Sequence, residues 1–464
     1  MEAHALLLAR LQFGFTISFH IVFPAFTIGL SAFIATLLVL WRRGGSDHFH
    51  RLARFWTKIF AVSFAMGVVS GIPMSYQFGT NWSRFSEVTG NVIGPLIGYE
   101  VLVAFFLEAT FLGVMLFGWK RVLPWLHVTS AVLVALGTAL SGFWILAANS
   151  WMHTPAGHVM RDGIAYPLDW FAIIFNPSFP YRFAHMMNAA YLTTSVVVLA
   201  LGARYRLANA FETEARTMMR MGTGMLALLA PLQLVLGDLH GLNTLEHQPA
   251  KIAAMEGHWE DRGPADLVLF AVPDERAETN RYAVAIPKLG SFILTHDWNG
   301  RFPGLTNFPP EDRPPVTSVF FAFRLMVGIG MFLIVLGLVG ALLWWRGRLF
   351  DTRPYLRAAS VSWPLGFIAI LAGWLTTESG RQPWIAYGIL RTSDALSPVS
   401  AAAVAASLTA FIVIYSVVFS IGIYYINRLM HRGPQGPALE PPPLPRSLPN
   451  RPLSAAQDPT EGAP

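Results

Sequence analysis

The sequence predicts an all-α integral membrane protein with nine transmembrane helices and one long outer loop. Hydrophobic residues make up 54% of the 464-residue chain and charged residues only 13%, whereas soluble proteins carry roughly one quarter charged residues. Nine windows are apolar enough to cross a bilayer, which takes about 20 residues. Basic residues cluster in alternate connections between these windows, as the positive-inside rule requires.

The nine predicted helices follow one another along most of the chain. They cover residues 12–41, 55–78, 94–118, 125–149, 182–204, 218–240, 319–345, 358–378 and 402–427. The first window is longer than the apolar part of a signal peptide, about 7–15 residues, so we interpret it as the first span. An odd number of spans places the two termini on opposite sides of the membrane.

The distribution of Arg and Lys predicts the orientation. The connections after spans one, three, five, seven and nine carry two to four basic residues each, and the intervening short loops carry one or two. Because the basic connections are cytoplasmic, the N-terminus is predicted to lie outside and the C-terminus in the cytoplasm. This topology signal also explains the net charge of +6, so we expect no nucleic-acid partner.

The spans divide the chain into four predicted regions. Residues 1–240 hold helices one to six, 241–318 form the outer loop, 319–432 hold helices seven to nine, and 433–464 form a cytoplasmic tail. The loop is too long for a simple connector, and the Pro-rich tail is predicted to be disordered. No internal repeat is visible, whereas many transporters carry one.

Redox chemistry in this chain would depend on His, Met or carboxylate ligands. The chain has no cysteine, which excludes disulfides, iron–sulfur clusters and thioether-attached haem. Most ionisable residues of the predicted spans fall in their outer halves; they are Glu100, Glu108, His185, Asp238, His240, Arg324 and Glu378, with His20 about a third of the way into the first span. Placing ionisable groups in lipid costs free energy, so their clustering in the outer halves of the spans indicates a functional site.

The histidines differ in what their surroundings indicate. His20 has aromatic and aliphatic neighbours that offer no polar partner, so it is a candidate haem ligand. His127, His153, His158 and His240 lie near helix ends, where interfacial hydrogen bonding is the simpler interpretation.

Met326 is a second candidate ligand. Methionine more often fills core space, and Met187 and Met331 compete for the role. Arg324 lies about 200° around the helix from Met326, so it either meets a haem propionate or snorkels to the membrane surface.

Two acids share one side of the third predicted helix. Glu100 and Glu108 are eight residues apart, which places them within about 80° and about 12 Å of each other. Either they pass protons through intervening water, or they make two separate interhelical hydrogen bonds.

Three local strings carry a family resemblance. They are RLQF at 10–13 followed by His20, GW at 373–374 leading into ESGRQPW at 378–384, and QPAKIAAME at 248–256. With nine spans and no cysteine, they resemble subunit I of cytochrome bd quinol oxidase over residues 8 to 430. The outer loop of about 78 residues resembles the short-loop, cyanide-insensitive-like subclass.

The resemblance implies two haem b and one haem d, with haem b replacing haem d in some members of the short-loop subclass. A low-spin haem b would lie between His185 and Met326, and a high-spin haem b would take Glu378. His20 would bind the oxygen-reducing haem, although which high-spin haem it ligates stays open. The implied cofactor-binding residues are His20, His185, Met326, Arg324, Glu378 and Arg10.

The resemblance also implies roles in proton and quinol chemistry. Glu108 and Ser141 would belong to a proton route from the cytoplasm, and Trp374 would lie between haems. Lys251 and Glu256 would bind quinol; without the resemblance, they would be solvated charges on a short loop helix. The implied catalytic residues are Glu100, Glu108, Glu378, Ser141, Trp374 and Arg381.

The resemblance implies oxidation of ubiquinol or menaquinol with reduction of dioxygen to water. This reaction would form a proton gradient without pumping, in a bacterial cytoplasmic membrane. The expected partners are a second membrane subunit (subunit II) and a small single-span accessory subunit. A haem–copper oxidase would need more intramembrane histidines. A proton-coupled transporter that uses Glu100, Glu108 and Glu378 is the alternative from another class.

Overall fold

The computed structural model describes residues 2–261 and 263–434. Within these ranges, eight helices are long and apolar enough to cross a membrane. Helices α12 (Arg353–Val361) and α13 (Leu365–Ser379), bent by 44° at their junction, supply a ninth candidate span. The predicted all-helical membrane fold is therefore confirmed. Residues 435–464 of the predicted tail lie outside the described part of the chain.

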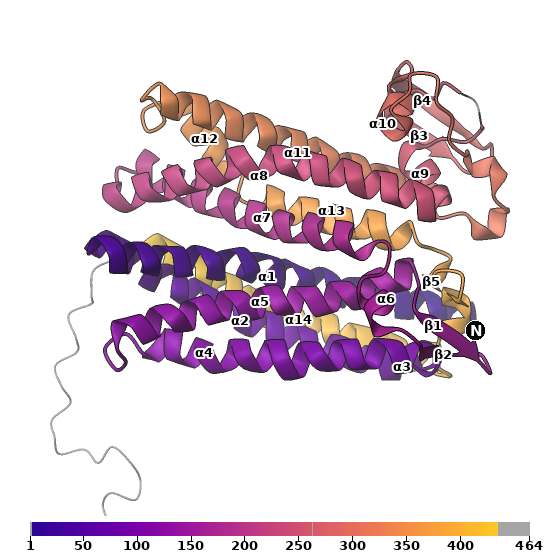
Figure 1. The fold of residues 1–464 in the computed structure, drawn as a ribbon, viewed down its shortest axis with the longest axis horizontal. Coiled ribbons are helices and arrows are strands. Elements are labelled where there is room, and N and C mark those ends of the chain that lie inside the picture. Colours follow the sequence, from indigo (N-terminus) through magenta and orange to yellow (C-terminus); the bar gives the residue numbers. More distant parts are fainter. Residues whose placement is uncertain (1, 262, 435–464) are drawn as a thin grey trace, which may run out of the picture.

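The spanning helices form one elongated bundle (Figure 1). They are α1 (Glu2–Gly44), α2 (Asp47–Thr80), α3 (Ser83–Tyr99), α4 (Phe106–Phe117), α5 (Pro124–His153), α7 (Phe179–Leu207), α8 (Glu212–His247), α11 (Val316–Trp345) and α14 (Ala401–Arg432). A π-helical segment, η1 (Glu100–Phe105), joins α3 to α4 in one span. Helices adjacent in the chain pack closely, α1 on α2 and α7 on α8, and α11 packs on α13.

The small elements gather at one end of the bundle (Figure 1). Two hairpins, β1 (His158–Arg161) with β2 (Ile164–Pro167) and β5 (Trp384–Ala386) with β6 (Leu390–Arg391), lie there with α6 (Trp170–Ile174) and η4 (Thr392–Ala395). Between α8 and α11 come α9 (Pro249–Glu256), β3 (Leu267–Asp274), β4 (Thr279–Ile286), α10 (Leu289–Thr295), η2 (Leu305–Asn307) and η3 (Pro310–Asp312). We call this end the loop end.

Several helices extend past the apolar windows that predicted them. Helix α8 continues to His247 and α11 begins at Val316, so the segment between them is shorter than the predicted loop. Polar residues sustain helical hydrogen bonding as well as apolar ones do, so hydropathy alone does not mark where these helices end.

Two of the apolar clusters join most of the helices of the bundle. One joins α1, α2, α5 and α7 around the fully buried Trp56 and Phe60. The other joins α7, α8, α11 and α12. Small residues allow the closest approach: Gly29 of α1 lies against Thr194 of α7, which leaves no room for a side chain. This packing fixes the helix ends that carry the polar groups described next.

Candidate functional site

Glu378, in the last turn of α13, is the centre of a buried polar cluster at the loop end. Its Oε1 accepts hydrogen bonds from Asn149 Nδ2 at 2.9 Å and from His153 Nε2 at 3.2 Å. Its Oε2 lies 2.5 Å from the Arg381 guanidinium. Both oxygens of the carboxylate are therefore held by side chains of α5 and of the segment that follows α13.

His153 connects Glu378 to the segment that follows α8. Lys251 Nζ of α9 lies 3.1 Å from His153 Nδ1, and both residues are buried, at 3% and 1% exposure. Gln248 donates to the His153 carbonyl at 2.9 Å. The contacts are satisfied together when Nδ1 accepts from Lys251 and Nε2 donates to Glu378. The result is a continuous chain of hydrogen bonds from α9 to α13.

The cluster carries more positive than negative groups. Two guanidinium groups, those of Arg182 and Arg381, lie near one acid, Glu378, and the Lys251 amine lies beside them. Burial first, and then the two neighbouring guanidinium groups, hold the pKa of the Lys251 amine well below its usual value. Arg182 Nε and two nitrogens of Arg381 are buried without a hydrogen-bond partner. Because buried donors are normally paired, the cluster has capacity for further acceptors, and its charge favours anionic ones.

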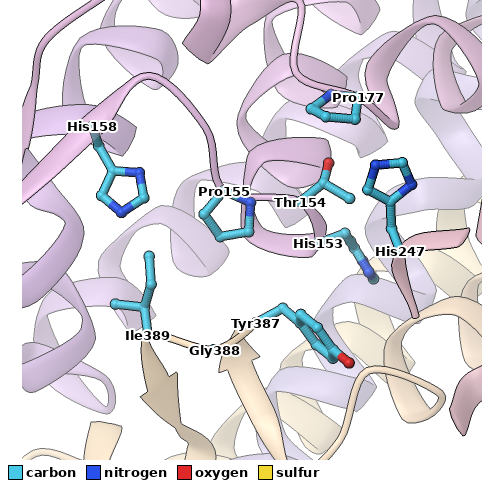
Figure 2. Close-up of a pocket in the computed structure, with 9 residues that line it drawn as sticks. All are labelled: His153, Thr154, Pro155, His158, Pro177, His247, Tyr387, Gly388 and Ile389. Carbon is cyan, nitrogen blue, oxygen red and sulfur yellow. The ribbon is translucent and has the colours of Figure 1, made fainter. Parts of the chain in front are cut away.

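A pocket of about 290 Å³ opens beside this cluster (Figure 2). It lies among the end of α5, the start of α7, the end of α8 and the β5–β6 turn. Its lining residues include His153, His158, His247 and Tyr387. His153 thus has the pocket beside it and Glu378 as a hydrogen-bond partner.

Arg324 and Glu256 form a second contact group at the loop end. The guanidinium of Arg324, on α11, donates to the carbonyls of Met255 at 2.5 Å and of Val268. It also lies 3.7 Å from the Glu256 carboxylate. Burial raises the pKa of Glu256, and the Arg324 charge opposes that rise. Arg324, which we expected either to meet a propionate or to snorkel, therefore fastens α9 and β3 to α11.

His185 and Met326 lie on α7 and α11. The Nδ1 atom of His185 is buried without a hydrogen-bond partner, and the imidazole lies beside Gly237 and 5.5 Å from the ring of His240. The Met326 sulfur lies so close to Gly373 of α13 that a Cβ there would approach it to 2.9 Å. These residues present a thioether and an imidazole, the latter with the His240 ring and the Arg182 charge nearby.

His20 is held from one side by α2. Its Nδ1 lies 3.1 Å from the Gly67 carbonyl and 3.2 Å from the Ser70 hydroxyl. The carbonyl is only an acceptor, so it favours the proton on Nδ1. Nε2 has no hydrogen bond to any described residue, and it is left with a free lone pair. This is the arrangement that orients a histidine ligand for a metal.

Glu100 and Glu108 lie on one span with different partners. The Ser141 hydroxyl of α5 donates to the Glu100 carboxylate at 2.7 Å. The resemblance associates Ser141 with Glu108, but the structure pairs it with Glu100. Glu108 is buried at 5% exposure, against Gly137 of α5.

Two further predicted residues, Arg10 and Trp374, lie outside the contact groups described above. Arg10 is exposed on α1, and Trp374 lies on α13 one turn before Glu378. The sequence did not indicate that His153, Arg182 and Asn149 belong to the buried cluster around Glu378. No local signal distinguishes a histidine at a helix end that faces the membrane surface from one that faces a buried acid, because the acid belongs to a distant segment.

The chain is similar to known proteins over nearly its whole length. The model of the family described as cytochrome bd terminal oxidase subunit I matches residues 8–434. Cytochrome bd-II ubiquinol oxidase subunit 1 of Escherichia coli K12 is 32% identical, covering 94% of this chain and 98% of the relative. Cytochrome bd ubiquinol oxidase subunit 1 of Bacillus subtilis 168 is 35% identical, covering 92% and 94%.

A solved structure shares the fold. The bd oxidase from Geobacillus thermodenitrificans superposes with a TM-score of 0.86 at 29% identity, covering 92% of this chain and 99% of that chain. At these values, the whole arrangement of helices is shared. The similarity favours the oxidase interpretation over the haem–copper and transporter alternatives.

Proposed function

The chain belongs to the cytochrome bd terminal oxidase subunit I family, and from this we propose that it is the haem-bearing subunit of a quinol oxidase that reduces dioxygen to water. The observation that carries this proposal is the buried chain of hydrogen bonds from Lys251 through His153 to Glu378. It joins the segment predicted to bind quinol to the acid predicted to bind haem.

We infer that the low-spin haem b would be held by His185 and Met326. The buried, unpartnered Nδ1 of His185 and the thioether packed against Gly373 fit a six-coordinate haem site. The free Nε2 of His20 fits an axial ligand for a second haem. Bound haem would supply the one-electron carriers between quinol and dioxygen.

Glu378 fits a ligand role only with rearrangement. Both of its oxygens already accept hydrogen bonds, so binding to iron would replace one of these contacts. The surrounding cations fit haem more directly: Arg182 and Arg381 offer unpaired buried donors, and haem propionates are carboxylates. We propose three haems, two of type b and a third of type d or b.

Quinol oxidation is assigned to Glu256 and Lys251. Oxidising a quinol removes two electrons and two protons, so the site needs proton acceptors. Burial raises the pKa of Glu256, which makes its carboxylate form a stronger base than an exposed one. The lowered pKa of Lys251 favours a neutral amine that can accept a hydrogen bond from a quinol hydroxyl.

The protons consumed in oxygen reduction are proposed to come from the cytoplasmic side of the membrane. Glu108 lies deeper in its span than Glu100, which the Ser141 hydroxyl holds toward α5. We propose that these residues pass protons inward from the cytoplasmic side. Quinol protons would leave at the loop end, which we place outside, so a proton gradient forms without pumping.

The proposed setting is a bacterial cytoplasmic membrane, with the N-terminus outside and the C-terminus in the cytoplasm. We propose a second membrane subunit as the partner that covers part of the bundle, and a small single-span subunit as a further partner. The substrates would be dioxygen and a membrane quinol, ubiquinol or menaquinol.

The test uses the purified complex. We expect haem bands in the reduced-minus-oxidised spectrum and oxygen uptake that depends on added ubiquinol or menaquinol. Lys251→Met should lower oxygen uptake and keep the haem bands. Lys288→Met is the matched control, because Lys288 is exposed on the same loop. A colourless complex without quinol-dependent oxygen uptake would overturn the proposal.

A further inference from the structure

The hairpin β3–β4 and helix α10 expose an unusual group of large apolar side chains. Tyr282 is 82% exposed, Val284 57% and Phe270 50%. The whole group, which we call the hairpin patch, consists of Leu269, Phe270, Val272, Tyr282, Val284, Ile286, Phe292 and Ile293. Phe270 and Val284 are register partners, so their side chains share a face. Exposed apolar patches of this kind usually mark a binding surface.

The hairpin is apolar at its base and charged at its tip, and the exposed residues Asp266 and Lys288 lie just beyond the base. Its base, residues 267–270 and 284–286, contains no charged residue. Its tip holds Asp274, Glu275, Arg276 and Glu278. A segment with this gradient suits a boundary between an apolar and an aqueous phase.

Contacts with α11 set the direction of that gradient. At the base, Arg324 Nε donates to the Val268 carbonyl at 2.9 Å. At the tip, the Thr317 amide donates to the Glu275 carboxylate at 3.0 Å. Thr317 lies in the first turn of α11, and the Arg324 guanidinium reaches back to within 3.4 Å of the Phe320 carbonyl, three residues further in and about 5 Å along the axis. The base of the hairpin therefore contacts α11 further from the N-terminus of that helix than the tip does.

The other end of α11 locates this base relative to a bilayer. Trp344 and Trp345 are exposed there, and tryptophan favours the membrane interface. About 20 helical residues cover the hydrocarbon thickness of about 30 Å, which places the second boundary near Leu325. Leu325 and Phe321 are exposed on α11, and the Phe321 ring lies 6.2 Å from that of Phe270. The patch thus continues the lipid-facing surface of α11.

We propose that the hairpin patch lies in the outer interfacial layer of the bilayer and contacts phospholipid acyl chains. The proposal rests on the proposed function, because it uses the same orientation. Asn280 of β4 donates to the Gly257 carbonyl at 2.7 Å and accepts from Trp259 Nε1 at 3.0 Å, which ties the hairpin to the end of α9 that carries Glu256. A lipid-soluble quinol would reach Glu256 sideways from the bilayer.

The test uses the absence of cysteine in this chain. Val284→Cys and, as a matched control at the charged tip, Arg276→Cys are made in the full complex and labelled with an environment-sensitive fluorophore. Tyr282→Cys serves as a second patch position in case Val284→Cys does not assemble. Each complex is reconstituted in phosphatidylcholine vesicles with a nitroxide high on the acyl chain, and the unsubstituted chain measures background labelling.

We expect quenching by the nitroxide lipid to be several-fold stronger at the patch than at Arg276→Cys. Equal quenching at the two positions, or a patch probe shielded from both lipid and water-soluble quenchers by a protein partner, would overturn the inference. Quinol-dependent oxygen uptake is measured on the same vesicles. Preserved uptake without the quenching difference rejects only the membrane contact, whereas loss of haem bands and uptake in the unsubstituted complex rejects the proposed function.

Discussion

Replacing Arg324 by Met should loosen the proposed quinol site without removing any proposed iron ligand. The guanidinium donates to the carbonyls of Met255 and Val268, and these bonds attach α9 and β3 to α11. Hydrogen bonds to charged groups contribute about 1.5–3 kcal/mol each, so two of them contribute about 3–6 kcal/mol. The population of the detached segment should then rise by about 10²–10⁴-fold.

Hydrogen exchange of the purified complex measures this change. We expect the amides of residues 249–270 to exchange faster in Arg324→Met by about 10²–10⁴-fold, while the amides of α1 and α2 keep their protection. The KM for quinol should rise, because Glu256 is no longer held in place.

The pH profile adds a second readout for the same variant. Burial raises the pKa of Glu256 and the Arg324 charge lowers it, so removing the charge should raise that pKa further. The carboxylate form, which accepts the quinol proton, would then form only at higher pH. The acid limb of the pH–rate profile should therefore shift to higher pH. Arg324→Lys keeps a charge and should leave the limb in place. Unchanged exchange at 249–270 together with an unchanged pH limb would refute this reasoning.

Three further variants test other contacts. Met326→Leu should abolish the low-spin haem signal in the difference spectrum and keep carbon monoxide binding; loss of carbon monoxide binding instead would contradict the ligand assignment. His153→Ala removes the link between Lys251 and Glu378 and should slow quinol oxidation more than His153→Gln, which keeps one donor; equal rates would argue against the link. Ser141→Ala removes one hydrogen bond to Glu100, about 0.5–1.5 kcal/mol, and should slow oxygen uptake by up to about tenfold; an unchanged rate would exclude Ser141 from the proton route.

The fold was largely predictable because lipid imposes a strong rule on sequence. A span must be helical and apolar over about 20 residues, so hydropathy located each candidate span in the described part of the chain. Hydropathy did not reveal the π-helical segment at Glu100–Phe105 or the continuation of α8 to His247. Both depend on backbone hydrogen bonding and local packing, for which the apolar pattern carries no signal.

Of the residues in the buried polar cluster, the sequence singled out those that lie in family motifs. The family strings singled out Lys251, Glu256 and Glu378, but spacing along the chain cannot show that His153 lies between two of them. That contact depends on where α5, α9 and α13 end relative to one another. Likewise, Arg324 was expected either to meet a haem propionate or to snorkel, and nothing in the sequence indicated its contacts with backbone carbonyls 56 and 69 residues away.

The most direct test of the proposed haem sites is an experimental density map of the purified complex around α7, α11 and α13. We expect a porphyrin whose iron lies between His185 and Met326, with further porphyrin density at His20 and propionates near Arg182 and Arg381. A map in which these side chains meet only lipid or ordinary helix contacts, with no porphyrin among them, would contradict the proposed sites.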